Sequence, residues 1–194
     1  MAKAEVNKVS LIIIGGSSGS LQVIIHILVN LPDDYPIPIL LIIHRASSND
    51  SMLLDLLSIK SNLTVREVEE KDKIISSCVY LAPADYHVLV EKDETFTLDY
   101  SEKLNYSRPS IDVSFISAAM VYGKNLIGIL LSGANEDGAE GLKRIKEEGG
   151  HTMIQHPDDA IVSFMPLQAS LKSKIDDVLN TNEITNYLIS LIPA

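Results

Sequence analysis

Residues 11–20 read Leu-Ile-Ile-Ile-Gly-Gly-Ser-Ser-Gly-Ser, and this stretch determines the fold class. Its first four residues are apolar and mostly β-branched, which is typical of a strand buried on both faces. The glycines and serines that follow predict a tight turn. From Leu21 to Leu31, apolar residues are dense enough to predict a helix packed on the sheet, ended by Pro32. The stretch therefore indicates the first strand–turn–helix unit of an α/β fold.

Two further buried strands are predicted, over residues 39–43 and 126–131, each followed by a polar segment. Shorter strands are expected over 64–68, 79–82 and 152–154, and helices from Ser51, from Ser110 and over 138–148, 166–173 and 183–191. Segments 88–90 and 95–98 flank a polar turn and predict a small antiparallel hairpin. Strands that alternate with helices predict a doubly wound, mostly parallel sheet with helices on both faces, a Rossmann-like three-layer arrangement.

The composition indicates one ordinary globular domain, and we expect it to span residues 1–194. The formal net charge is −10 at pH 7 and the chain has no Trp, which argues against binding a nucleic-acid backbone or stacking on bases. The single cysteine, Cys78, allows no intrachain disulfide and fits a reducing, cytoplasmic setting. The apolar run over 39–43 is far shorter than the roughly 20 residues of a membrane span, so no membrane insertion is expected.

Ser17 is the candidate nucleophile, because residues 15–19 fit the pattern G-x-S-x-G between a predicted strand and a predicted helix. A sharp strand–turn–helix lifts the serine hydroxyl clear of the backbone, and the helix amino terminus favours developing negative charge. Two other interpretations stay open from the local sequence. The segment could be a glycine-rich turn that only packs a helix on a strand, or a phosphate-binding loop, although it lacks the Gly-Lys-Ser/Thr ending.

His44 is the candidate general base, since it ends the buried strand over 39–43 and a serine hydroxyl needs a base. A hydrogen-bonded core histidine is the alternative. Among the other histidines, His156 is the one serious rival, because it follows the short strand over 152–154. The carboxyl ends of parallel strands meet at one edge of a sheet, so Ser17 and His44 are expected to lie at the same edge.

Asp137 is the candidate acid that orients the base, because it closes the small-residue loop after the strand over 126–131. Its position before a predicted helix also makes it a candidate N-cap, and the adjacent Glu136 is an alternative acid. No Cys/His cluster has the spacing of a metal site, so neither a metal nor another cofactor is expected.

Several motifs in a fixed order identify a family resemblance. Residues 14–19 match I-G-x-S-x-G, residues 42–44 place a histidine after an apolar strand, and residues 131–138 are similar to L-[TS]-G-M-G-x-D-G. Further matches are residues 80–87 with Y-[IL]-A-P-x-x-x-H, residues 107–112 with x-R-P-S-[IV]-D, and residues 165–166 with M-P. On these motifs the chain resembles the catalytic domain of the chemotaxis methylesterases, the CheB family, from about residue 9 to about residue 179.

The resemblance implies a protein-glutamate methylesterase that hydrolyses glutamate γ-methyl esters on chemoreceptors and, as in some members, deamidates receptor glutamines. It implies Ser17 as nucleophile, His44 as base and Asp137 as acid. The backbone N–H groups of Ser18 and Ala134 would form the oxyanion hole, and Arg108 and Met165 would lie at the substrate. Where the family has Met and Gly, this chain has Ala134 and Asn135; a backbone donor survives the first change, while the second can alter the loop.

The implied partner is the methylated cytoplasmic helices of a chemoreceptor. Family members usually carry an amino-terminal receiver domain, but here the first predicted strand begins near Val9, so we expect a stand-alone domain or a fragment, controlled by a separate receiver domain or another regulator. An acidic receptor and an acidic chain repel each other, so docking requires a local basic or apolar patch, for which Arg45, Lys103 and Arg108 are candidates. Two rival functions remain: a non-catalytic partner-binding module of the same fold, and an esterase with another substrate.

Overall fold

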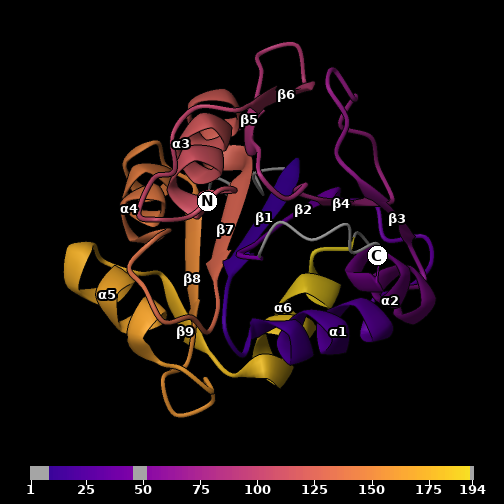
Figure 1. The fold of residues 1–194 in the computed structure, drawn as a ribbon. Helices are drawn as coiled ribbons and strands as arrows, with labels where there is room; N and C mark the ends of the chain where they lie inside the picture. Colours follow the sequence, from indigo (N-terminus) through magenta and orange to yellow (C-terminus); the bar gives the residue numbers. More distant parts are fainter. Residues whose placement is uncertain (1–8, 46–51, 193–194) are drawn as a thin grey trace, which may run out of the picture.

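The computed structural model describes residues 9–45 and 52–192 and shows a central sheet with helices on both sides (Figure 1). The strands of the main sheet are β1 (Leu11–Gly16), β2 (Ile39–Ile43), β3 (Thr64–Glu67), β4 (Cys78–Leu81), β7 (Leu126–Leu130), β8 (His151–Gln155) and β9 (Asp177–Leu179). The helices are α1 (Ser20–Asn30), α2 (Met52–Lys60), α3 (Ile111–Tyr122), α4 (Ala139–Glu147), α5 (Phe164–Lys172) and α6 (Thr181–Ser190), with a 3₁₀ turn, η1 (Gly123–Asn125), before β7. The helix start expected at Ser51 lies outside the described residues. Within those residues, no helix combines the length and apolar character that crossing a membrane requires.

The seven strands of the main sheet lie in the order β3-β4-β2-β1-β7-β8-β9, and every neighbouring pair is parallel. From β1 the chain builds outward through β2 on one side and later through β7 on the other. The strand order therefore reverses between β1 and β7, and such a switch point is where doubly wound sheets bind their ligands. The predicted doubly wound parallel sheet is confirmed. The sequence pattern does not predict β9, because three residues with little burial carry no clear periodicity.

Helices α1, α2 and α6 cover one face of the sheet, and α3, α4 and α5 cover the other (Figure 1). Successive residues of β1 supply the two cores in turn: Leu11 and Ile13 pack toward α3 and α4, whereas Ile12 and Ile14 pack toward α1. All four are fully buried. A strand covered on both faces has no solvent-facing position, which explains the unbroken apolar run.

A small antiparallel hairpin of β5 (His87–Val90) and β6 (Phe96–Asp99) lies beside α3. Val88, Val90 and Phe96 are buried in the same core as Phe115 of α3. The predicted hairpin is therefore confirmed, and it packs against α3.

Helix α3 begins directly over the end of β1, at a contact that only glycine permits. A Cβ on Gly15 would lie 2.5 Å from Ile111 Cγ2 and 3.2 Å from Phe115 Cζ. The missing side chain lets the backbone of β1 approach the first residue of α3. This approach brings the amino terminus of α3 to the switch point, where the candidate site lies.

Candidate functional site

The predicted meeting of three strand ends is present in the backbone. Ser17 N–H, just after β1, donates to Ser132 O, just after β7, at 2.9 Å, and His44 N–H, just after β2, donates to Gly16 O at 3.2 Å. The Ser132 hydroxyl ties the same loops together by donating to Ser18 O at 2.7 Å. Ser17 and His44 therefore lie on neighbouring strand ends, with the loop after β7 on the other side of Ser17.

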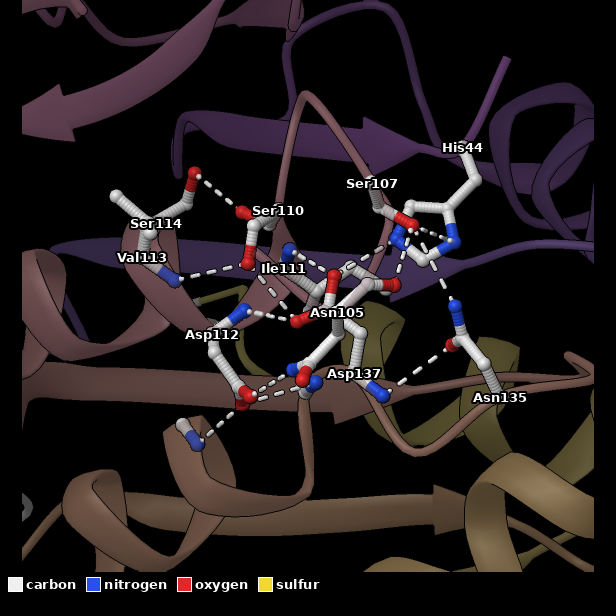
Figure 2. Close-up of polar contacts among 12 residues, drawn as sticks. His44, Asn105, Ser107, Ser110, Ile111, Asp112, Val113, Ser114, Asn135 and Asp137 are labelled. Carbon is white, nitrogen blue, oxygen red and sulfur yellow. Dashed lines mark hydrogen bonds and ion pairs between the residues drawn. The ribbon is translucent and has the colours of Figure 1, made fainter. Parts of the chain in front are cut away.

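The histidine and the carboxylate predicted after β2 and β7 are in contact. His44 Nε2 lies 2.8 Å from Asp137 Oδ2 (Figure 2). The Asp137 side chain is fully buried, and the His44 side chain is 11% exposed. The candidate base and the acid that would orient it are therefore in direct contact.

Asp137 is held by three further donors from the start of α3. The backbone N–H groups of Ile111 and Asp112 donate to it at 2.7 and 3.0 Å, and the Ser110 hydroxyl donates at 2.9 Å (Figure 2). Burial alone raises the pKa of Asp137, but the hydrogen bonds from His44, Asp112 and Ile111 outweigh it and hold that pKa below its ordinary value. Asp137 is therefore an anion at neutral pH, able to accept all four bonds.

The two alternatives for this loop are Asp137 as the N-cap of the following helix and Glu136 as the acid, and neither matches the structure. Asp137 caps a helix, but the helix is α3, over 20 residues earlier in the chain, and not α4, whose N-cap Gly138 has no side-chain cap. Glu136 is exposed and pairs with Lys172 at 3.4 Å on the surface. The geometry therefore favours Asp137 over Glu136 as the acid.

The other ring nitrogen of His44, Nδ1, lies near Ser107. Because the anionic Asp137 needs a donor, we assign the proton to Nε2, which leaves a lone pair on Nδ1. Ser107 Oγ lies 3.4 Å from that Nδ1, and the Asn135 amide donates to Ser107 Oγ, also at 3.4 Å (Figure 2). Sequence reasoning did not single out Ser107, although it stands at the unassigned first position of the x-R-P-S-[IV]-D match.

Ser17 is partly exposed, and no hydrogen bond joins its hydroxyl to another residue in the described part of the chain. A Cβ on Gly133 would lie 3.1 Å from Ser17 Cβ and 2.4 Å from Met165 Cε. Gly133 is therefore the spacer between the predicted nucleophile and Met165. Met165 itself is fully buried and packs beneath the loop.

The two predicted oxyanion donors are free to bind a ligand. Ser18 and Ala134 are both exposed, and neither backbone N–H has an acceptor among the described residues. By contrast, the intervening Gly133 N–H is used, donating to Val162 O at 3.0 Å. Ser18 directly follows Ser17, and Ala134 follows Gly133, which packs against Ser17. Unpaired N–H groups near the nucleophile are what a developing oxyanion requires.

A pocket of about 380 Å³ opens beside His44, and the predicted basic residues line it. Its walls combine three cations, one carboxylate, a tyrosine and the Ser107–His44 pair: His44, Arg45, Asp85, Lys103, Tyr106, Ser107 and Arg108. Arg45 is used structurally, since it pairs with Glu67 and donates to Ala82 O at 3.1 Å. Lys103 is exposed. The structure thus brings Arg45, Lys103 and Arg108 together.

Arg108 anchors the loop that forms one wall of this pocket. Its guanidinium donates to Ser101 O at 2.8 Å and to Tyr100 O at 3.3 Å, and its Cζ atom lies 3.9 Å from the Tyr100 ring centroid. These contacts hold residues 100–107 against the mouth of the site. Tyr106, which the motifs did not mark, is 98% exposed at that mouth.

The remaining histidines lie apart from the pair. His156, the rival base, is partly exposed and its Nδ1 lies 3.9 Å from the Asp158 carboxylate. His87 is 1% exposed; its Nδ1 accepts from Ser110 N–H at 3.0 Å, and its Nε2 lies 3.0 Å from Glu102 O. His87 is therefore a structural histidine that positions Ser110. No group of three or more possible metal-ligating side chains gathers in residues 9–45 and 52–192.

The fold and the site define a doubly wound α/β protein with a serine and a histidine–carboxylate pair at its switch point. The chain belongs to the CheB methylesterase family, whose sequence model matches residues 12–188. The resemblance expected from the motifs is thereby confirmed.

Individual relatives agree with this assignment. The chain is similar to the crystal structure of the Thermotoga maritima CheB methylesterase catalytic domain, with a TM-score of 0.89 and 31% identity over 94% of this chain and 98% of that one. A Leptospira interrogans protein named "Putative protein-glutamate methylesterase/protein-glutamine glutaminase" is 43% identical over 180 residues, 93% of each chain. Protein-glutamate methylesterase/protein-glutamine glutaminase 1 of Carboxydothermus hydrogenoformans is 36% identical over 187 residues, and the match covers 94% of this chain but only 55% of that protein.

Proposed function

We propose that this chain is a single-domain serine esterase that hydrolyses glutamate γ-methyl esters of chemoreceptors through Ser17, His44 and Asp137. One observation carries the proposal: the His44–Asp137 hydrogen bond of 2.8 Å lies at the strand end next to Ser17. The names of the relatives, protein-glutamate methylesterase/protein-glutamine glutaminase, support the choice of ester.

The acylation step follows from the roles of the two ring nitrogens of His44. Ser17 Oγ attacks the ester carbonyl carbon while its proton passes to His44 Nδ1, the nitrogen that carries the lone pair. Asp137 stabilises the imidazolium through Nε2–H. The imidazolium then gives the proton to the methoxy oxygen, the C–O bond breaks and methanol leaves. Water, deprotonated by His44, attacks the carbonyl carbon of acyl-Ser17; the acyl C–O bond breaks, the imidazolium returns the proton to Ser17 Oγ, and glutamate leaves.

The tetrahedral intermediate places a negative charge on the former carbonyl oxygen. The unpaired N–H groups of Ser18 and Ala134 are the donors for that oxyanion. Removal of one oxyanion-hole donor typically raises the activation free energy by about 2.7–4 kcal/mol. The same steps with a glutamine amide release ammonia in place of methanol, so deamidation of receptor glutamines is a second reaction of this site.

The basic pocket supports a protein substrate rich in carboxylates. Lys103 lines the pocket beside His44 in a chain of net charge −10, so it places positive charge where the substrate docks. Arg108 lines the same pocket, with its guanidinium 4.0 Å from the Asp85 carboxylate. Met165 supports the loop of Gly133 and Ala134 from below and shapes the substrate site without contacting solvent. A separate receiver domain or another regulator would control access to this face.

The deciding experiment is methanol release from methylated chemoreceptor, compared between the unmodified protein and Ser17→Ala. We expect release by the unmodified protein and none by the folded variant. Activity on aryl esters but not on the receptor would favour an esterase with another substrate. A folded protein inert toward both substrates and toward a serine-directed phosphonate would favour a partner-binding module and overturn the proposal.

A further inference from the structure

Helices α3 and α4 cap each other through two aspartates. Asp137 stands just before α4, yet it accepts from the backbone N–H groups of Ile111 and Asp112 at the start of α3. Asp112 belongs to α3, yet its Oδ1 accepts from Gly138 N–H at 2.8 Å and Gly141 N–H at 2.7 Å at the start of α4. Each helix thus receives its carboxylate cap from the neighbouring segment.

This exchange makes the position of Asp137 depend on Asp112. The N-cap of α4 is Gly138, which has a φ of 96° and no side chain to satisfy the free N–H groups of its own helix. Asp112 supplies that missing acceptor, and Gly138 is bonded covalently to Asp137. The Asp112 side chain makes no hydrogen bond to His44 or Ser17 in the described residues. Its Oδ1 holds the start of α4, next to Asp137, and its Oδ2 accepts from Asn105 Nδ2 at 3.2 Å.

We infer that Asp112 is a positioning residue, whose carboxylate holds the start of α4 and thereby keeps Asp137 in line with His44 Nε2. The inference rests on the proposed function for its catalytic consequence, but the placement of the His44–Asp137 bond can be tested without any substrate. A displacement of about 1 Å in a catalytic group is enough to cost on the order of 100-fold in rate.

Burial and a neighbouring negative charge both disfavour the ionised form of Asp112. It is 4% exposed and lies next to the anionic Asp137. Burial, and then the charge of Asp137, raise the pKa of Asp112 to about 6, against the two backbone hydrogen bonds that lower it. A second buried carboxylate is unfavourable unless its hydrogen bonds are needed, which agrees with a positioning role.

The test compares Asp112→Ala with Asp112→Asn and with a matched control, Asp176→Ala. Asp176 also accepts hydrogen bonds at a helix-to-strand junction, from Thr152 N–H at 3.0 Å and Thr152 Oγ1 at 2.9 Å, but before β9, at the amino-terminal ends of the strands. It pairs as well with Lys146 in the last turn of α4, so it controls for a loss of stability at the far end of that helix. Two readouts are measured: kcat and KM for methanol release, and the low-field proton NMR resonance of His44 Nε2–H, identified by its absence in His44→Gln.

We expect Asp112→Ala to lower kcat by about 10- to 100-fold with KM within about twofold, and to remove the low-field resonance. Asp112→Asn keeps an acceptor oxygen and should recover part of the kcat and the resonance, whereas Asp176→Ala should keep both even if it is less stable. An Asp112→Ala protein with unchanged kcat and an unchanged resonance overturns the inference.

Two further outcomes stay decisive. If Asp112→Ala does not fold, Asp112→Asn carries the test, with an expected kcat loss of about 3- to 10-fold at constant KM and a shifted resonance; parental values for both would reject the positioning role. If the unmodified protein releases no methanol, the proposed function fails, and the resonance alone decides whether Asp112 holds Asp137 on His44.

Discussion

His44 Nε2 and Asp137 Oδ2 lie 2.8 Å apart, although 93 residues separate them in the chain. The acid therefore holds Nε2, and Nδ1 is the nitrogen left to take a proton from a serine. In the Ser-His-Asp arrangement of chymotrypsin-like proteases the two nitrogens have the opposite assignment. The same chemistry is available in both, because a neutral imidazole has one donor and one acceptor nitrogen.

Asp137→Asn is expected to lower kcat by about 10³- to 10⁴-fold, because an amide no longer fixes the tautomer that leaves Nδ1 free. Steady-state methanol release measures the effect. The matched control is Glu136→Gln, at the adjacent exposed position, which should keep kcat within about twofold. A larger loss in the Glu136 variant than in the Asp137 variant would assign the acid to Glu136.

A serine-directed phosphonate is expected to label Ser17 and not Ser107. Ser107 Oγ lies 3.4 Å from His44 Nδ1, so its position also makes it a candidate. The proposed oxyanion donors favour Ser17, because Ser18 follows it directly and Gly133, next to Ala134, packs against it. Mass spectrometry of the digested adduct locates the phosphonate. Ser107→Ala should still be labelled and Ser17→Ala should not. Label on Ser107 in the unmodified protein would move the nucleophile to that residue.

Lys103→Glu is expected to raise KM for methylated receptor by about 3- to 10-fold at low salt, because it reverses the charge of an exposed side chain at the pocket. The difference should shrink as salt screens the interaction. Lys124→Glu makes the same charge change just before β7, at the amino-terminal ends of the strands and away from the pocket, and serves as the control. Equal KM values for the two variants would show that net charge, and not the pocket, governs docking.

The stability of the protein should fall as the pH rises from about 4 to about 6. Burial and the charge of Asp137 raise the pKa of Asp112 to about 6 in the folded state, whereas its unfolded value is near 4. The folded state therefore binds this proton more tightly, and the gain, full below about pH 4, is lost as the pH rises through about 6. The loss amounts to roughly 2–3 kcal/mol in the free energy of unfolding.

Asp112→Asn should remove that pH dependence, and urea denaturation from pH 4 to 7 compares the two proteins. Asp137 acts in the opposite sense, because its lowered pKa contributes stability above about pH 4 that is lost on further acidification. The two contributions fall in different pH ranges. Parallel stability curves for the unmodified protein and Asp112→Asn would contradict the prediction.

The local sequence predicts most of the helices and strands and the end of the sheet at which the candidate site lies. Unbroken apolar runs at residues 11–14 and 39–43 reveal strands buried on both faces, because such strands have no exposed position. Parallel strands bring their carboxyl ends to one edge, so the convergence of Ser17, His44 and the loop of Asp137 follows from strand direction alone. Short, poorly buried β9 gives no comparable pattern and was missed.

The partners of each side chain were decided only by the tertiary structure. Whether Asp137 caps its own helix or orients a histidine is not encoded in its neighbours; it is settled by Gly15, which lets α3 approach β1 and present its N–H groups to Asp137. Likewise, the roles of Ser107 and Asp112 depend on contacts between segments distant in sequence. The local sequence pattern indicates which residues are buried and which way a strand runs. The hydrogen-bond partners of the side chains at the strand ends depend on how segments distant in sequence pack together.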